Sequence, residues 1–243
     1  MAALTPRDRL IVALDLPTVP EARAFVERMG DEVTFYKIGL ELVMSGGLDL
    51  ARELALAGKQ IFLDMKLLDI GNTVERATRS AAATGATFLT IHGVDTKTLK
   101  AALAGRAGTG LKLLAVTVLT SLGEDDLVEQ GLSRSVGEMV AHRAKLARDA
   151  GIDGVVASSL EAARVREIVG TDLAIVTPGI RLPDDAAGDQ TRIATPQVAI
   201  AAGADYIVAG RPLTTAPDPR EAARSFVESI EEGLTLRSLG TAG

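Results

Sequence analysis

Short apolar runs alternate with longer amphipathic segments along the whole chain. The apolar runs are rich in Val, Ile and Leu and have the length of buried strands. They predict strands at residues 10–15, 34–39, 60–66, 88–93, 112–120, 154–158, 173–179 and 206–213. The segments between them carry helical patterns, for example at 18–30, 73–85, 135–151 and 218–233. Several of these segments end in glycine, as helices often do.

Near-continuous apolar strands joined by helices are typical of a parallel sheet that helices cover. Eight strand–helix units in 243 residues predict an α/β protein with a single (β/α)8 TIM barrel, in preference to an open sheet. No Pro-rich or Ser-rich linker divides the sequence. We therefore expect one barrel domain over residues 1–243, with a flexible C-terminal tail from about residue 235.

Composition narrows the possible functions. The formal net charge of −6 argues against a general affinity for nucleic acid or for an anionic membrane. The absence of cysteine excludes disulfides and thiolate chemistry, and two histidines in separate segments exclude a His-rich metal cage. The first apolar run is too short, and its flank too charged, for a signal peptide or a membrane span. We expect a soluble, cytoplasmic protein.

The strand predicted at 60–66 ends in charged residues, which is unusual for a buried strand. Asp64 and Lys66 are two positions apart and so face the same side of the strand. Asp69 follows on the loop, where it could bend back or reach into a neighbouring subunit. Lys37, expected at the end of the preceding strand, would lie beside Asp64. Buried charges are costly unless they are paired or used. A row of these four residues would keep each member charged, with Lys66 as a proton donor. The alternative is a structural ion-pair network.

Arginines and glycines follow the last two predicted strands. Ligand phosphates in such barrels often bind to these loops, and Arg is well suited to bidentate phosphate contacts. The loops supply Arg181, Gln190, Arg192, Gly210 and Arg211. Together they predict a phosphate site, although any one of these arginines alone could be ordinary solvated surface.

Four other polar residues at strand ends have two possible roles each. Asp15 could bind sugar hydroxyls or cap the following helix, and His92 could be structural as readily as catalytic. Thr120 and Ser121 could contact a ring, or could simply terminate a strand. The residues by themselves leave these choices open.

Several blocks of the sequence resemble the bacterial orotidine 5′-phosphate decarboxylase family over nearly the whole chain. The D-x-K-x-x-D motif is present as Asp64, Lys66 and Asp69, and sister sugar-phosphate enzymes share this spacing. The blocks "VALD", "FYKIG", "VTVLTS", "TPGIR", "DQTRIATP" and "VAGRPL" accompany it in order. Leu68 and Gly71 depart from the family pattern, which often has His and Pro there. These two differences concern loop rigidity.

The resemblance implies a homodimer that converts orotidine 5′-monophosphate to UMP and CO2 without cofactor or metal, as the final step of de novo pyrimidine nucleotide biosynthesis. It implies that Lys66 protonates C6 and that Asp64, paired with Lys37, lies near the departing carboxylate. It also implies that Asp69, Ile70 and Thr73 reach into the partner's site.

The implied substrate contacts are Asp15 and Lys37 to ribose, Thr120 or Ser121 to the pyrimidine, and Gln190, Gly210 and Arg211 to phosphate, with Arg181 on a closing loop.

Two other functions are compatible with this kind of barrel. A sister enzyme, such as a Mg²⁺-dependent sugar-phosphate decarboxylase or aldolase, would need an acidic ligand set for its metal. A non-catalytic nucleotide-binding barrel would not need the two lysines, and Lys37 and Lys66 are both present.

Overall fold

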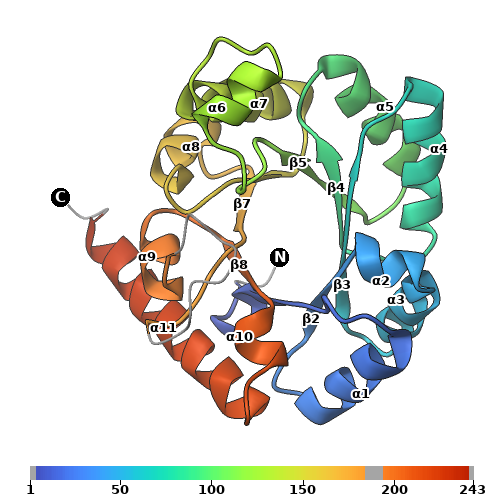
Figure 1. Cartoon of the computed structure of the whole chain (residues 1–243), viewed down its shortest axis with the longest axis vertical. Coiled ribbons are helices and arrows are strands. Elements are labelled where there is room, and N and C mark those ends of the chain that lie inside the picture. The colour runs from blue at the N-terminus through green and yellow to red at the C-terminus, as the bar shows by residue number, and fades with distance from the viewer. Residues whose placement is uncertain (1–3, 184–193, 241–243) are drawn as a thin grey trace.

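The chain folds into a closed barrel of eight parallel strands that run in sequence order from β1 to β8 (Figure 1). The computed structural model describes residues 4–183 and 194–240. The strands are β1 (Leu10–Ala13), β2 (Phe35–Gly39), β3 (Gln60–Leu67), β4 (Phe88–His92), β5 (Lys112–Val116), β6 (Gly154–Val156), β7 (Ala174–Thr177) and β8 (Tyr206–Ala209). β8 pairs with β1 and so closes the barrel, which confirms the predicted (β/α)8 fold.

Helices surround the barrel and connect its strands (Figure 1). They are the 3₁₀ helix η1 (Arg7–Arg9), α1 (Val19–Met29), α2 (Leu40–Met44), α3 (Gly47–Leu56), α4 (Gly71–Ala82), α5 (Thr96–Arg106), α6 (Glu124–Glu129), α7 (Val136–Ala150), α8 (Ala162–Val169), α9 (Pro196–Ala201), α10 (Arg211–Thr214) and α11 (Pro219–Gly240). Local sequence sets several ends: Ser135 and Glu138 form a capping box at the start of α7, and Gly151 ends it with φ 81°. Among the described residues, no helix is long and apolar enough to cross a membrane.

Two of the predicted strands extend furthest beyond the observed ones. The run predicted as a strand to residue 120 ends at Val116, and the run predicted to residue 213 ends at Ala209 and continues as α10. Strand pairing explains both limits, because Val116 is the last residue of β5 paired with β4 and β6, and Ala209 is the last residue of β8 paired with β1. A strand ends where its neighbours end, however apolar the sequence beyond it. The last helix, α11, continues to Gly240. The flexibility of the tail from about residue 235 stays a prediction.

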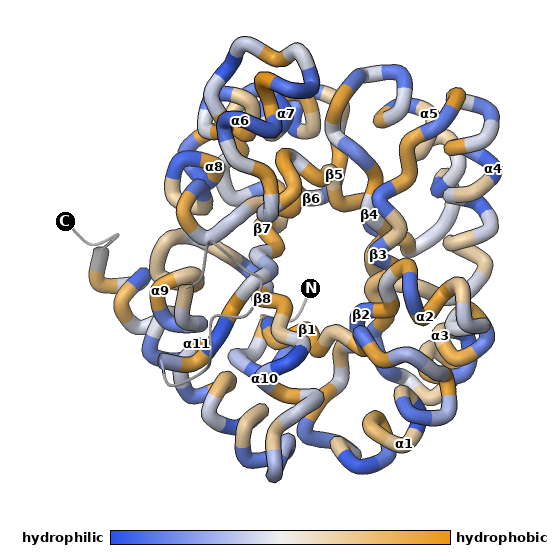
Figure 2. Tube along the Cα trace, in the orientation of Figure 1, coloured by the Kyte–Doolittle hydropathy of each residue, from blue (hydrophilic) through white to orange (hydrophobic). Residues whose placement is uncertain are grey.

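Apolar side chains form two cores, one inside the barrel and one between the barrel and the helices. The inner core is aromatic: the ring centroids of Phe35 and Phe88 are 5.2 Å apart, and Tyr206 meets Phe88 edge-on at 5.2 Å. Phe62 packs edge-on against the same Phe88 ring, at 6.0 Å. Such pairs add about 0.5–1.5 kcal/mol beyond the area they bury. In Figure 2 the strands are mostly hydrophobic, because both faces of the sheet are buried. The helices alternate between the two colours, because only one face of each is buried.

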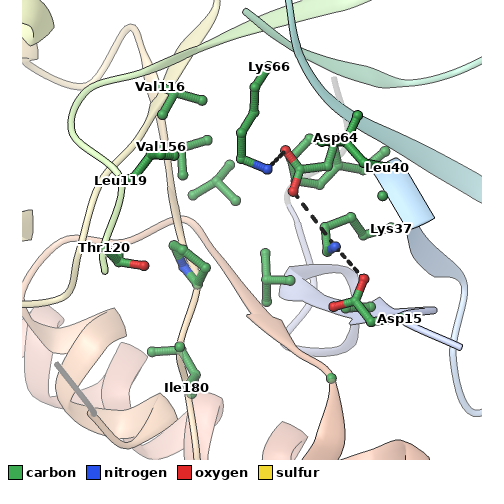
Figure 3. Close-up of a pocket in the computed structure, with 18 of the residues that line it drawn as sticks. Asp15, Lys37, Leu40, Asp64, Lys66, Val116, Leu119, Thr120, Val156 and Ile180 are labelled. Atoms are coloured by element: carbon green, nitrogen blue, oxygen red, sulfur yellow. Dashed lines mark hydrogen bonds and ion pairs between the residues drawn. The ribbon is translucent and has the colours of Figure 1, made fainter. Parts of the chain in front are cut away.

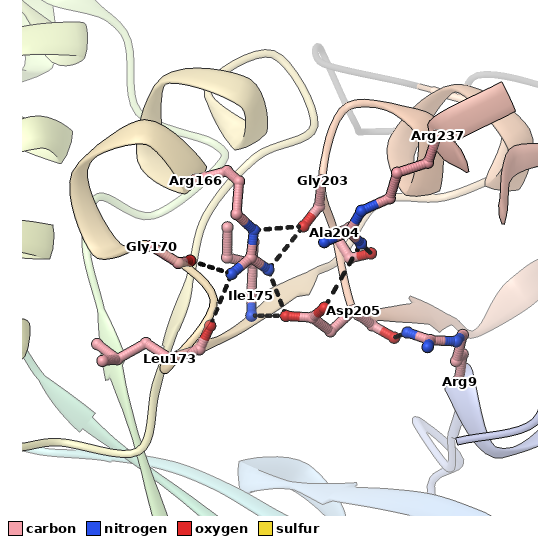
Figure 4. Close-up of polar contacts among 9 residues, drawn as sticks. All are labelled: Arg9, Arg166, Gly170, Leu173, Ile175, Gly203, Ala204, Asp205 and Arg237. Atoms are coloured by element: carbon pink, nitrogen blue, oxygen red, sulfur yellow. Dashed lines mark hydrogen bonds and ion pairs between the residues drawn. The ribbon is translucent and has the colours of Figure 1, made fainter. Parts of the chain in front are cut away.

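A polar network fastens the chain at the N-terminal end of β8 (Figure 4). The carboxylate of Asp205 accepts a hydrogen bond from the backbone N–H of Ile175 in β7 (2.9 Å) and pairs with Arg166 of α8. Nη1 of Arg237, in α11, lies 3.5 Å from the same carboxylate. Arg9 donates to the backbone carbonyl of Asp205 at 3.0 Å. Only 21% of the Asp205 side chain is exposed, so these charges are largely shielded from water. Three segments, β7, α8 and α11, contact its carboxylate, and Arg9 contacts its backbone.

We predict that Asp205→Ala lowers the free energy of unfolding by about 3 kcal/mol, because it leaves buried arginines without their counter-ion. Urea unfolding of the two proteins measures the difference. The matched control is Asp49→Ala, since Asp49 also pairs with an arginine but its side chain is 90% exposed. That change should cost less than about 1 kcal/mol. Similar losses in the two variants would contradict a stabilising role for the Asp205 network.

Candidate active site

A cavity of about 570 Å³ opens at the C-terminal ends of the strands. Its base includes Phe62 of the aromatic inner core, and its wall includes the last residues of several strands. Of the residues singled out in the sequence, those that line it are Asp15, Lys37, Asp64, Lys66, Thr120, Arg181, Gly210 and Arg211. The barrel thus brings together residues that lie almost 200 positions apart in the sequence.

Four charged side chains form a continuous row along one side of the cavity (Figure 3). Oδ1 of Asp15 lies 2.8 Å from Nζ of Lys37, which lies 3.7 Å from Oδ2 of Asp64. Oδ1 of Asp64 in turn lies 2.8 Å from Nζ of Lys66. The charges alternate in sign from one end of the row to the other, and the exposed fraction of the two central side chains, Lys37 and Asp64, is only 10% and 15%. Alternation makes burial of these charges tolerable.

Within a single chain, the observed row differs at both ends from the four residues predicted. Asp15 belongs to it, whereas Asp69 does not: Asp69 is exposed, and its carboxylate accepts a hydrogen bond from the backbone N–H of Ile70 at 2.6 Å. Lys37 is the third residue of β2 and not its end. Its Cα is paired with that of Phe62, and Asp64 is paired with Gly39, so the long lysine side chain reaches Asp64 diagonally. The expected contact between Lys37 and Asp64 is nevertheless present.

The surroundings of Asp64 favour its ionised form. Burial by itself would raise the pKa of this carboxyl group, but the ammonium groups of Lys37 and Lys66, with hydrogen bonds from Lys66 and Thr90, outweigh burial and hold the pKa below its ordinary value. Asp64 is therefore a carboxylate throughout the neutral range.

Gly39 is a residue of this site that the sequence did not reveal. A Cβ atom at position 39 would lie 3.2 Å from Nζ of Lys37 and 3.3 Å from Oδ1 of Asp15. Its absence leaves room for that ion pair. The sequence signal was the glycine two positions after a buried lysine, in "FYKIG".

The remaining predicted residues divide into three groups. Thr120 lines the cavity opposite the charged row, whereas Ser121 is exposed and is not among the described lining residues (Figure 3). Asp69, Ile70 and Thr73 are exposed on the segment that joins β3 to α4 and enters that helix, outside the cavity of their own chain. Gln190 and Arg192 lie outside the residues that the structure describes.

The arginines at the other side of the cavity differ in exposure. Arg181 follows β7 and is buried, with 7% of its surface exposed. Arg211 is exposed and begins α10, directly after Gly210. Both line the cavity.

His92 ends β4 and is half-buried. Burial lowers its pKa, and the charges of Arg143 and Lys66 act in the same direction, against Asp64. The described residues contain no group of three or more His, Asp or Glu side chains that could hold a metal ion.

Comparison with known proteins shows the family to which the chain belongs. The profile of the "Orotidine 5'-phosphate decarboxylase / HUMPS family" matches residues 8–226. The orotidine 5′-phosphate decarboxylase of Bradyrhizobium sp. (strain BTAi1 / ATCC BAA-1182) is 56% identical over 233 residues, which are 96% of each chain. That of Methylobacterium sp. (strain 4-46) is 54% identical over 94% of this chain and 98% of its own.

A solved structure shows the same fold. The crystal structure of orotidine 5′-phosphate decarboxylase from Lactobacillus acidophilus superposes with a TM-score of 0.82 at 38% identity, and covers 91% of this chain and 98% of its own. With a family profile along most of its length and relatives more than half identical to it, the chain belongs to the orotidine 5′-phosphate decarboxylase / HUMPS family.

Proposed function

We propose that this enzyme converts orotidine 5′-monophosphate to UMP and CO2, the step that completes de novo pyrimidine nucleotide synthesis, by means of its own charged side chains and without a cofactor. The observation that carries the proposal is the row Asp15–Lys37–Asp64–Lys66 on the wall of a cavity large enough for a nucleotide. The names of the 54–56% identical relatives support the substrate.

The chemistry requires a proton donor beside C6 of the pyrimidine. When the bond between C6 and the carboxylate breaks, CO2 leaves and the electron pair stays on C6, in the plane of the ring, where the π-system cannot delocalise it. An ammonium group next to C6 stabilises this charge and then supplies the proton. Lys66 is in position to act as this donor. It lines the cavity, and 30% of its side chain is exposed, against 10% for Lys37, the other lysine in the row.

The other members of the row hold Lys66 and meet the rest of the substrate. The Asp64 carboxylate contacts Lys66 and faces the departing carboxylate of the substrate, while Lys37 neutralises Asp64 from behind. Asp15, at the exposed end of the row, and Lys37 contact the ribose hydroxyls. Thr120, across the cavity, contacts the pyrimidine.

The phosphate group binds at the ends of β7 and β8. Arg211, Arg181 and the backbone at Gly210 line that side of the cavity. Gln190, which follows β7 in the sequence and lies outside the described residues, is a further phosphate ligand on the resemblance to the family. For a reaction that is very slow without a catalyst, an enzyme has to lower the activation barrier by roughly 20 kcal/mol. One ammonium group supplies only part of that amount, and the binding energy of a remote phosphate can orient the reacting carbon and contribute another part.

The enzyme acts as a homodimer of single-domain subunits in the cytoplasm. Large apolar side chains are exposed on the segments that follow β2 and β3: Leu40 (47%), Met44 (80%), Leu68 (53%) and Ile70 (73%). Such side chains at the rim of the cavity support a contact with a second copy. In the dimer Asp69, Ile70 and Thr73 reach the partner's cavity, which accounts for their exposure here.

We predict that purified protein decarboxylates orotidine 5′-monophosphate, measured as loss of orotidylate absorbance, and that EDTA leaves the rate unchanged. Lys66→Ala should lower kcat by at least about 10⁴-fold, because both the ammonium group and the proton are lost, while UMP still binds. The control is Lys112→Ala, at the opposite end of the barrel. Turnover in Lys66→Ala would refute the general-acid role, and inhibition by EDTA would favour a metal-dependent sister enzyme.

We predict that two inactive variants restore activity when their subunits are mixed. In a dimer of Lys66→Ala with Asp69→Ala, one of the two sites contains an intact Lys66 and the partner's intact Asp69. Random pairing should therefore recover about a quarter of wild-type activity, because half of the dimers are mixed and each has one complete site. The measurement is turnover after co-expression or joint refolding. Activity no higher than the sum of the separate variants would place Asp69 in its own subunit's site.

A further inference from the structure

Strand β3 is irregular where it carries Asp64 and Lys66. Its pairing with β4 passes from Leu63↔Leu89 directly to Leu67↔Ile91, so three residues of β3, Asp64 to Lys66, face the single residue Thr90 of β4. Among the described residues, Lys66 is also the only non-glycine residue with a positive φ, 49°. A left-handed backbone is unfavourable for an L-residue and persists only when its surroundings hold it.

Thr90 supplies that hold through its side chain. Its Oγ1 accepts a hydrogen bond from the backbone N–H of Lys66 at 2.9 Å, and donates one to Oδ1 of Asp64 at 2.9 Å. The single hydroxyl proton therefore goes to Asp64, and the oxygen receives the Lys66 N–H. Thr90 is completely buried and is not among the described residues that line the cavity, so it acts on its two neighbours and not on a ligand.

The same hydroxyl fixes the rotation of the Asp64 carboxylate. Oδ1 of Asp64 receives the Thr90 hydroxyl and, at 2.8 Å, lies beside Nζ of Lys66, which leaves Oδ2 to face Nζ of Lys37 at 3.7 Å. Of the three partners of Asp64, Lys37 and Lys66 are long charged side chains that can move, whereas Thr90 is short and neutral. Without the Thr90 hydroxyl, Asp64 therefore loses its one fixed partner. One buried side chain thus sets both the main chain of Lys66 and the direction in which its counter-ion points.

We infer that Thr90 is a positioning residue for the reaction, which holds the backbone of Lys66 and the carboxylate of Asp64 so that the ammonium group is aimed at C6. This inference rests on the proposed function. Packing alone does not require a hydroxyl at this position, since valine has nearly the same shape and suits a strand equally well. The sequence signal is a lone threonine between apolar residues in "FLTIH".

The test compares Thr90→Val with Thr90→Ser in steady-state turnover of orotidine 5′-monophosphate. The valine variant should lose about 10- to 100-fold in kcat, as expected for one preorganised hydrogen bond to a charged group, with KM and the Kd for UMP changed less than about threefold. The serine variant, which restores the hydroxyl, should recover kcat to within about threefold. A general packing defect would instead weaken UMP binding and would not be rescued by serine.

The matched control is Thr177→Val. Thr177 is also a completely buried threonine of a barrel strand, but its hydroxyl has no hydrogen-bond partner in the part of the chain that the structure describes. Its kcat should stay within about twofold of wild type. Should Thr90→Val fail to fold, Thr90→Ser and Thr90→Ala form a second pair that differs by one hydroxyl, and the serine variant should be at least about tenfold faster.

The possible outcomes separate this inference from the proposed function. No turnover by the wild-type protein would refute the proposed function itself. Wild-type turnover together with an unchanged kcat in Thr90→Val, an equal loss in Thr177→Val, or equal rates for the serine and alanine variants would overturn the role of Thr90 alone.

Discussion

The site depends on the mutual neutralisation of charges at the mouth of an apolar barrel. Lys37 and Asp64 are both largely buried, and neither would be tolerated there alone. Each is flanked by opposite charges, Lys37 by Asp15 and Asp64, and Asp64 by Lys37 and Lys66. Because every member has a partner on the row, the last ammonium group, that of Lys66, can project into the cavity while its counter-ion stays in place. The alternating charges thus stabilise the ammonium group of Lys66 in the way that surrounding water would stabilise it in solution.

The barrel makes this arrangement possible in two ways. Parallel strands all end on one rim, so β1, β2 and β3 deliver Asp15, Lys37 and the Asp64–Lys66 pair to the same wall. Below that rim the rings of Phe35, Phe62, Phe88 and Tyr206 fill the interior of the barrel, and Phe62 contributes to an apolar base of the cavity. An apolar base strengthens each electrostatic contact above it, because little water screens the charges from that side. At the opposite end of the barrel, the Asp205 network serves to fasten β7, β8 and their helices (Figure 4).

Much of this could be predicted from the sequence, and the errors have physical causes. The apolar runs gave the strand order and the side on which Asp64 and Lys66 lie, because alternation along a strand has a fixed period. That period carries no information on a bulge, so the left-handed Lys66 and the role of Thr90 were not foreseen. Nor does it show how far a side chain reaches: Lys37 was expected to act from a strand end, and it acts diagonally from the middle of β2. The spacing also left open whether Asp69 bends back toward the row or reaches a neighbouring subunit, and the structure leaves it exposed on its own chain.

The most direct test of the account is whether Lys66 exchanges a proton with C6. A group that delivers a proton to C6 in the forward reaction must also remove it in the reverse direction. The measurement is ¹H NMR of UMP in D2O with the enzyme, following the signal of the proton on C6. The account predicts that the wild-type enzyme replaces this proton by deuterium and that Lys66→Ala, which still binds UMP, does not. Equal exchange rates in the two proteins would show that another group, or water, protonates C6, and would remove the chemical reason for the charged row.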